Sequence, residues 1–230
     1  MTTVGLVGGL GPESTIDYYR RILKAWSDAE PGTAPSMLID SLDVQRIMRF
    51  VASDRAAVAE YLGESLDRLA NAGVDFAAIT ANTPHIVFDE VARRSRVPLI
   101  SIVEVCAEEA HRLGLTRLAL LGTRFTMQAD FYPKVFARHG IAVVVPDERD
   151  QIWAHDRYTI ELLKGTFLDS TRHGFVELIT RLRDEKKVDG VILGGTELPL
   201  LLQSPVIADL PILDTTALHV AAIVKRLRRE

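Results

Sequence analysis

Short runs of apolar residues alternate along the chain with longer stretches in which apolar residues recur every three or four positions. Runs that are apolar at nearly every position are typical of strands buried on both faces of a sheet, and the longer spacing is typical of amphipathic helices. This alternation predicts an α/β fold with mainly parallel sheets covered by helices. The predicted strands are Thr3–Val7, Met37–Ile39, Phe76–Thr80, Leu99–Ser101, Arg117–Leu121, Ile141–Val145, Gly190–Leu193 and Ile212–Leu213.

The two halves of the chain repeat a pattern of strand, small-residue turn and helix start. The segment Thr3–Pro12 (TVGLVGGLGP) resembles Arg117–Met127 (RLALLGTRFTM), and Asp75–Pro84 (DFAAITANTP) resembles Asp189–Pro199 (DGVILGGTELP). We therefore predict two similar α/β domains. Residues 1–113 with 210–230 form the first domain, to which the final helix returns, and residues 114–209 form the second.

Composition and charge narrow the classes of function. The 230 residues include 27 Lys and Arg against 31 Asp and Glu, a net charge of -4, which argues against a nucleic-acid-binding surface. The single cysteine, Cys106, excludes an intramolecular disulfide and a multi-thiolate zinc site. The longest apolar runs fall short of the ~20 residues of a membrane helix, and no secretory signal is visible. We expect a cytoplasmic protein that does not associate with a membrane.

Four turns at predicted strand ends carry the candidate chemistry, because ligands of open α/β sheets bind beyond the carboxyl ends of the strands. The first is rich in glycine, which lets the backbone approach an anion, although a tight turn explains the glycines equally well. The other three place hydroxyl or amide side chains at helix starts, where they can cap the helix or hold a carboxylate. The candidate binding residues in these turns are Gly9, Asn82, Thr83, Thr123, Thr126 and Thr196.

Four motifs together resemble the aspartate/glutamate racemase family, the amino-acid racemases that use no pyridoxal phosphate. They are GLVGGLGPEST near the start, Ala81–Thr83 (ANT), Leu121–Met127 (LGTRFTM) and Gly194–Leu202 (GGTELPLLL). The resemblance implies two similar α/β domains with the active site between them, and no cofactor or metal. It also implies a small amino acid or dicarboxylate as ligand, a homodimer, and α-carboxylate or amino-group binding by Asn82, Thr83, Thr123 and Thr196.

The chain departs from this family at its two catalytic cysteines, whose positions are occupied by Ala81 and Gly195. Two-base racemisation needs an acid and a base on opposite faces of the α-carbon, and neither residue carries a titratable atom. Cys106 lies in a predicted helix away from the four turns. We interpret it as a buried small hydrophobic residue rather than a displaced nucleophile.

Other polar residues near the turns offer weaker candidates for catalysis. Glu197 could act as an acid–base group if burial favours its protonated form, although we favour a role in capping a helix or orienting its neighbours. The hydroxyl of Thr80 is a poor base without an activating partner. We interpret His85 as a surface or helix-packed residue rather than a base. Arg46 and Lys164 are candidates for binding a distal substrate carboxylate.

Four hypotheses follow. The first is a family enzyme with altered chemistry of isomerase, lyase or decarboxylase type, and we place it slightly ahead of the second, a catalytically inactive ligand-binding or regulatory homologue. The third is a racemase whose cysteines have been replaced. The fourth, a dinucleotide-binding oxidoreductase, rests on a G-x-G-x-x-S pattern at Gly9–Ser14 and on Asp40. We rank it last because Pro12 stiffens that turn and the third glycine is absent.

Overall fold

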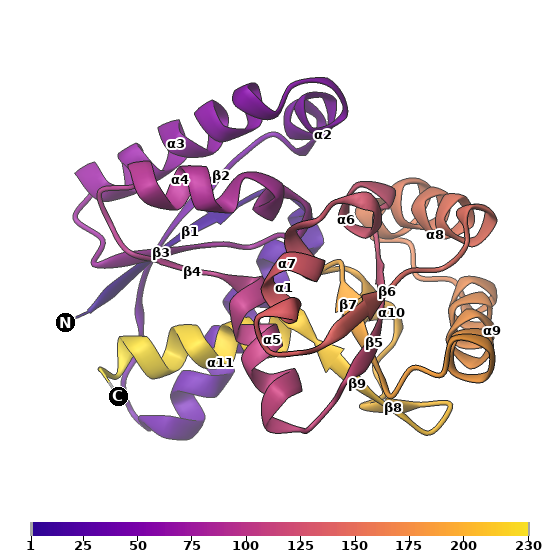
Figure 1. The fold of residues 1–230 in the computed structure, drawn as a ribbon. Coiled ribbons are helices and arrows are strands. Elements are labelled where there is room, and N and C mark those ends of the chain that lie inside the picture. The colour runs from indigo at the N-terminus through magenta and orange to yellow at the C-terminus, as the bar shows by residue number, and fades with distance from the viewer. Residues whose placement is uncertain (1, 230) are drawn as a thin grey trace. The chain divides into compact units, whose positions relative to one another are not determined.

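The computed structural model describes residues 2–229, which form two units, each built on its own sheet (Figure 1). The first unit runs through Ile102 and resumes at Thr216, and the second is Val103–Thr215. The boundaries predicted from the sequence assign residues 103–113 and 210–215 to the first unit. The structure places both segments in the second unit. For residues 210–215 the reason is that the strand beginning at Leu210 pairs with the second sheet.

The first unit contains a four-stranded parallel sheet in the order β2-β1-β3-β4. Helices α1 and α11 cover one face through an apolar cluster that includes Tyr18, Ile22 and Val220, whereas α3 lies on the other face, where Leu69 approaches the backbone of Gly5 (Figure 1). The final helix, α11, belongs to this unit. The elements are β1 (Thr3–Gly8), α1 (Pro12–Ala29), β2 (Ser36–Ser41), α2 (Val44–Ser53), α3 (Arg55–Asn71), β3 (Phe76–Ile79), η1 (Thr83–Val87), α4 (Phe88–Arg94), β4 (Leu99–Ile100) and α11 (Thr215–Leu227).

The second unit contains a five-stranded sheet in the order β6-β5-β7-β9-β8, parallel except for the pair of β8 with β9. Its first four positions reproduce the strand order of the first sheet, which confirms two similar α/β halves. Apolar residues of α8 and α9, among them Tyr158 and Phe175, pack on β5 and β7. The elements are α5 (Ile102–Arg112), β5 (Arg117–Gly122), α6 (Arg124–Gln128), α7 (Phe131–Ala137), β6 (Ala142–Val144), α8 (Glu148–Ile160), η2 (Leu162–Lys164), α9 (Asp169–Lys186), β7 (Gly190–Gly194), α10 (Leu198–Leu201), β8 (Val206–Ile207) and β9 (Leu210–Asp214).

A pair of aspartates explains part of the sequence repeat. Asp75 precedes β3, and its carboxylate accepts a hydrogen bond from the backbone N–H of Thr3 at 2.7 Å. Asp189 precedes β7 in the same way and accepts from the N–H groups of Thr116 and Arg117 at 2.7 and 2.9 Å. Each carboxylate thus satisfies backbone donors where the neighbouring strand begins, so the two halves share a local reason for the same residue.

All eight predicted strands are present, but the outer strands are less buried than predicted, and there is one further strand. The central strands β1, β3, β5 and β7 are buried along nearly their whole length, as expected. The edge strands β2 and β6 are not. Leu38 and Ile39 of β2 are 37% and 40% exposed, and Ala142 of β6 is exposed. The further strand is β8, which forms a hairpin with β9.

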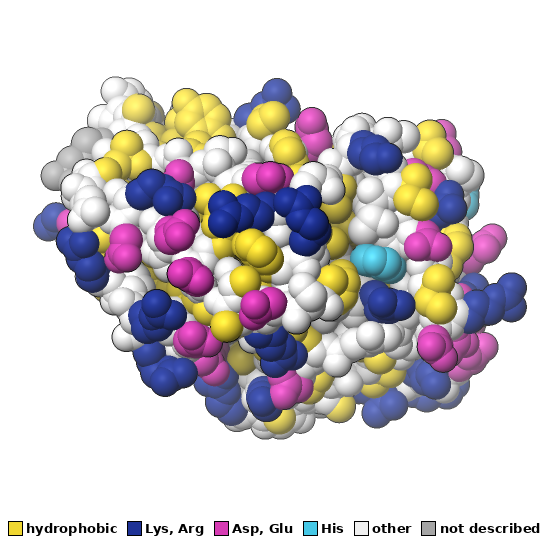
Figure 2. Space-filling model, turned by 90° about the horizontal axis from the view of Figure 1, so that it is seen from above, with side chains coloured by type: hydrophobic (Ala, Val, Ile, Leu, Met, Phe, Trp, Pro, Cys, Tyr) yellow, Lys and Arg dark blue, Asp and Glu magenta, His cyan; other side chains and the backbone are white. Residues whose placement is uncertain are grey.

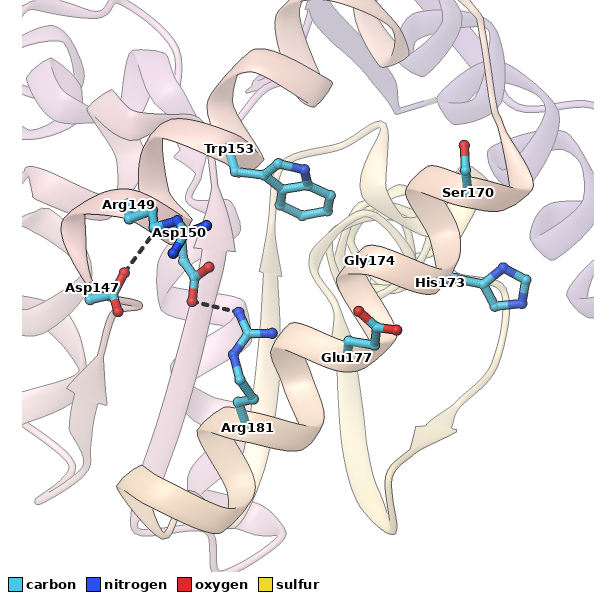
Figure 3. Close-up of a pocket in the computed structure, with 9 residues that line it drawn as sticks. All are labelled: Asp147, Arg149, Asp150, Trp153, Ser170, His173, Gly174, Glu177 and Arg181. Atoms are coloured by element: carbon cyan, nitrogen blue, oxygen red, sulfur yellow. Dashed lines mark hydrogen bonds and ion pairs between the residues drawn. The ribbon is translucent and has the colours of Figure 1, made fainter.

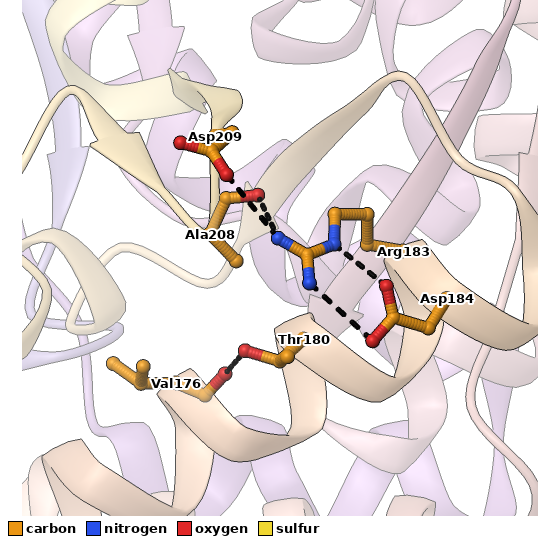
Figure 4. A network of polar contacts seen from close by, with 6 residues as sticks. All are labelled: Val176, Thr180, Arg183, Asp184, Ala208 and Asp209. Carbon is orange, nitrogen blue, oxygen red and sulfur yellow. Dashed lines mark hydrogen bonds and ion pairs between the residues drawn. The ribbon is translucent and has the colours of Figure 1, made fainter.

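The hairpin of β8 and β9 turns at Ala208 and Asp209, which have positive φ angles of 50° and 61°. Residues with a Cβ rarely adopt this conformation, so the turn needs support from its surroundings. Arg183 of α9 provides it, donating from Nη1 to the Ala208 carbonyl at 3.0 Å (Figure 4). The same guanidinium pairs with Asp184 at 2.8 Å and with Asp209 at 3.4 Å.

Gly63 offers a test of local helix energetics. It lies inside α3, and a Cβ built there meets nothing within 4 Å. Because glycine is less favourable than alanine in a helix interior by about 0.5–1 kcal/mol, we expect Gly63→Ala to raise the Tm by about 1–4 °C. Thermal unfolding followed by circular dichroism measures the shift. A lower Tm for the variant would contradict the open surroundings of this position.

Candidate functional site

The turn after β1 is tight because its backbone packs against the end of β2. Gly9 has a φ of +74°, and a Cβ there would lie 2.2 Å from the carbonyl oxygen of Leu42. The Gly9 N–H donates to the Thr15 hydroxyl at 2.9 Å, and that hydroxyl donates to the carbonyl of Gly11 at 3.1 Å. Packing and this contact therefore account for the glycine, and its amide already has an acceptor within the chain.

The turn after β3 adjoins the turn after β1, because the two strands pair up to Val7 and Ile79. Thr80 is fully buried, and its hydroxyl donates to the Val7 carbonyl at 3.0 Å. Ala81 and Asn82 follow as buried residues, and the half-buried Thr83 begins η1. The structure thus brings Thr80, Asn82 and Thr83 together. The hydroxyl proton of Thr80 is used in its hydrogen bond to β1.

His85 supports this turn from within the core. Its Nδ1 lies 2.9 Å from the Ala81 carbonyl oxygen, and its Nε2 lies 3.4 Å from the backbone nitrogen of Ile102. Nδ1 therefore carries the proton and Nε2 accepts, which fixes the neutral tautomer. Burial, with the nearby His219, lowers the pKa of His85 to about 3. The ring also stacks on Phe88, so the interpretation of His85 as a packed residue is confirmed.

The turn after β5 carries two buried threonines. The Thr123 hydroxyl caps α6 by accepting from the backbone N–H of Thr126 at 3.2 Å, and it lies 3.1 Å from the Thr126 hydroxyl. In the next residue, the backbone N–H of Arg124 donates to Nδ1 of His155 at 3.3 Å. Thr123 therefore caps a helix, which is one of the two roles, capping or carboxylate binding, that the sequence suggests for this turn.

The turn after β7 holds a buried carboxylate. Glu197 is 1% exposed, and its Oε2 accepts hydrogen bonds from the Tyr158 hydroxyl and, at 3.1 Å, from the Thr196 hydroxyl. Tyr158 comes from α8, distant in sequence. Burial, together with the charge of Glu197, raises the pKa of Tyr158 well above its ordinary value, so its hydroxyl stays protonated and donates. Two neutral donors on one buried carboxylate oxygen form the most polar cluster among the four turns.

The two turns of the second unit lie side by side. Strands β5 and β7 pair as far as Gly122 and Gly194, where both end. A Cβ on Gly194 would lie 3.4 Å from Cγ2 of Thr126, so the turn after β5 touches the end of β7. The structure therefore brings Thr123, Thr126, Thr196 and Glu197 to the same edge of this sheet.

The charged candidates outside the turns have other partners or an exposed position. The Arg46 guanidinium lies over the rings of Tyr61 and Phe50, 4.6 and 5.4 Å from their centres. Lys164 is exposed at the end of η2. Asp40 is one of the residues on which the oxidoreductase hypothesis rests. Its carboxylate forms an ion pair with Arg68 at 2.8 Å.

Cys106 is buried in α5, as predicted. Burial, with the charges of Asp214 and Glu109, raises the pKa of its thiol above its ordinary range, so the thiol is not ionised at neutral pH. Across residues 2–229, the structure groups no three His, Cys, Asp or Glu side chains that could hold a metal ion. Ala81 and Gly195 lie in the turns after β3 and β7.

A groove of about 700 Å³ lies elsewhere in the second unit, between α8 and α9 (Figure 3). Trp153 and the exposed His173 and Glu177 line it, and its Asp150 and Arg181 pair with each other at 2.6 Å. Residues of the four turns do not line this groove. Its charges are partly neutralised within the protein, so it gives no comparable cluster of polar groups.

The surface and the helices complete the description. Basic and acidic side chains are interspersed on the face shown in Figure 2, without an extended basic area. Among the described residues, every helix is too short or too polar to cross a bilayer.

Known proteins resemble this chain in sequence and in fold. The family model for Asp/Glu/hydantoin racemase matches residues 7–223. The broad specificity amino-acid racemase RacX of Bacillus subtilis is 26% identical over 224 residues, which are 93% of this chain and 93% of that protein. An aspartate racemase homologue from Pyrococcus horikoshii OT3 is 31% identical, with a TM-score of 0.83 over 99% of this chain and 100% of that chain.

A more distant structure shares the fold alone. Glutamate racemase from Francisella tularensis, solved in complex with D-glutamate, is 16% identical, with a TM-score of 0.68 over 99% of this chain and 81% of that chain. The family model covers nearly all of the sequence, and the strand-end turns follow one another in the order that the motifs predict. The chain therefore belongs to the Asp/Glu/hydantoin racemase family.

Proposed function

We propose that the protein binds a small amino acid or dicarboxylate through its strand-end turns, and that Glu197 supplies the acid–base group of an altered family reaction. The observation that carries this proposal is the buried Glu197 carboxylate, held by Tyr158 and Thr196 next to the turn of Thr123 and Thr126. An acid–base residue needs a fixed orientation and a water-poor environment, and this turn offers both. RacX and the D-glutamate complex indicate the ligand class within the family.

We infer that two-base racemisation is lost, because it needs an acid and a base on opposite faces of the α-carbon. The chain's one cysteine is the buried Cys106. In the turn after β3, Ala81 has no titratable atom, and both ring nitrogens of His85 have partners in the core. A single acid–base group favours a reaction that exchanges or delivers one proton, of isomerase, lyase or decarboxylase type. The absence of titratable atoms at Ala81 and Gly195 favours a second candidate, a ligand-binding homologue without turnover.

Binding and proton exchange test the two candidates together. We expect calorimetry with D- and L-amino acids and with dicarboxylates to identify at least one ligand. Proton magnetic resonance in heavy water then follows exchange at its α-carbon and the formation of any product. Glu197→Gln removes the carboxylate at nearly constant volume and is expected to slow the reaction about 10²–10⁴-fold. The control is Glu177→Gln, an exposed glutamate of α9.

The turns themselves are tested by removing a hydroxyl. Thr196→Val, in the turn after β7, should weaken binding of the ligand about tenfold, the effect of one hydrogen bond to a charged group. Binding with no exchange and no product would select the ligand-binding homologue. If no compound of either class binds the native protein, the proposal is wrong. Full activity of Glu197→Gln would remove Glu197 from it.

A further inference from the structure

Position 195 is closed to any side chain by a tyrosine from another element. A Cβ on Gly195 would lie 2.4 Å from Cε2 of Tyr158, and 2.9 Å from both its Cζ and its hydroxyl oxygen. Carbon atoms in contact lie about 3.5–4.0 Å apart, so the ring occupies the space of that Cβ. Gly195 is not among the glycines with a positive φ. The need for glycine here therefore comes from the tyrosine ring and not from the backbone conformation.

The Tyr158 ring is held at both ends, so it cannot yield easily. The residue is 4% exposed, and its ring belongs to the apolar core formed by α8, α9 and the sheet. Its hydroxyl donates to Oε2 of Glu197, two residues beyond Gly195. A ring that is packed on its sides and hydrogen-bonded at its tip has no free direction in which to rotate away from a new side chain.

We propose that Tyr158 is a positioning residue of the turn after β7: its ring takes the space of a side chain at position 195, and its hydroxyl holds the Glu197 carboxylate in place. The steric part stands on the geometry alone, and the role of the carboxylate rests on the proposed function. A small acid at this turn meets the oxygens of Thr196 and Glu197, because Gly195 contributes only backbone. The site and its supporting tyrosine thus form one unit in which Gly195 and Tyr158 depend on each other.

The steric part is tested without a ligand by a double-mutant cycle in thermal unfolding. Gly195→Ala in the native background is expected to lower the Tm by about 5 °C, because the new methyl group overlaps the ring. The same change should cost under about 1 °C in a Tyr158→Leu background, which removes the ring, and should keep its full cost with Tyr158→Phe. An equal cost of Gly195→Ala in all three backgrounds would overturn the pairing.

The positioning part is tested by removing only the hydroxyl. Tyr158→Phe is expected to weaken ligand binding about tenfold in the native background, and less than about twofold with Glu197→Met, because the tyrosine hydroxyl then has no side-chain oxygen to hold. The same cycle in thermal unfolding measures the hydrogen bond in the absence of ligand. Tyr19→Phe is the control, since this tyrosine is 44% exposed on α1.

The outcomes separate the two proposals. Tyr158→Phe could lower ligand affinity and Tm by the same amounts whether or not Glu197 is present. That result would show that the tyrosine does not act through the carboxylate. If the native protein binds no compound of the panel, the proposed function fails, and the two unfolding cycles still decide whether Tyr158 pairs with Gly195 and with Glu197. Coupling in unfolding without coupling in binding would reject a role for Tyr158 in the site.

Discussion

Replacing Gly9 with alanine is expected to lower the free energy of unfolding by about 3–5 kcal/mol and the Tm by about 10 °C. Two costs add at this position. A residue with a Cβ is strained at a φ of +74°, and the Cβ would lie 2.2 Å from the carbonyl oxygen and 2.6 Å from the nitrogen of Leu42. Both atoms belong to the backbone, and the Leu42 N–H is bonded to the Gly8 carbonyl at 2.9 Å. Neither atom can move without breaking the end of the sheet.

Gly73 is the matched control for this prediction. It follows α3 with a φ of +84°, and a Cβ there would meet nothing within 4 Å. Gly73→Ala thus has the backbone strain without the overlap and should cost about 1 kcal/mol. Urea unfolding of the two variants measures both terms. Equal losses would mean that the approach of Leu42 does not limit this turn, and a role for Gly9 in holding a ligand would then be the better explanation of the glycine.

The fold could be predicted largely because its strongest signals are local. A strand buried between two layers of helices is a continuous apolar run, and the four central strands are of this kind. The hairpin of β8 and β9 was not predictable in this way. Its turn lacks the Gly or Asn that marks a positive φ, and Arg183 of a distant helix supports Ala208 instead.

The same distinction applies to the site. Thr123 follows β5 directly and Thr196 comes two residues after β7, so the sequence places both at the sheet edge before any tertiary contact is known. Tyr158 lies in a helix about forty positions earlier, and no motif separates it from the aromatic residues of an ordinary core. Its contact with Glu197 depends on how α8 packs on β7, which no local pattern specifies. Position 195 must be glycine because the Tyr158 ring fills the space of a Cβ there, so this requirement too depends on a contact between distant parts of the chain.

Lowering the pH from 8 to 5 is expected to destabilise the first unit by about 4 kcal/mol through two buried histidines. Burial lowers the pKa of His85 to about 3 and that of His219 to about 4, from an ordinary 6.5. Below pH 6.5 these two histidines therefore bind protons in the unfolded chain but stay neutral in the folded chain. Their contribution to stability is complete above pH 6.5 and is lost as the pH falls towards 4 and 3. At pH 5 each site is 1.5 units below 6.5, which corresponds to about 2 kcal/mol.

The hydrogen bonds of the two rings explain why protonation is resisted and which variants test it. Nε2 of His219 donates to the Ile100 carbonyl at 3.1 Å, so its Nδ1 accepts from the Tyr18 hydroxyl at 2.9 Å. A proton on Nδ1 would put a positive charge in a fully buried site and would require the Tyr18 hydroxyl to accept instead of donate. His219→Gln and His85→Asn keep a neutral amide donor in place of the donating nitrogen. Each should remove about 2 kcal/mol of the loss between pH 8 and pH 5 in urea unfolding, whereas the exposed His173→Asn should change nothing. If stability fell equally steeply in all three variants, the acid sensitivity would arise from other groups.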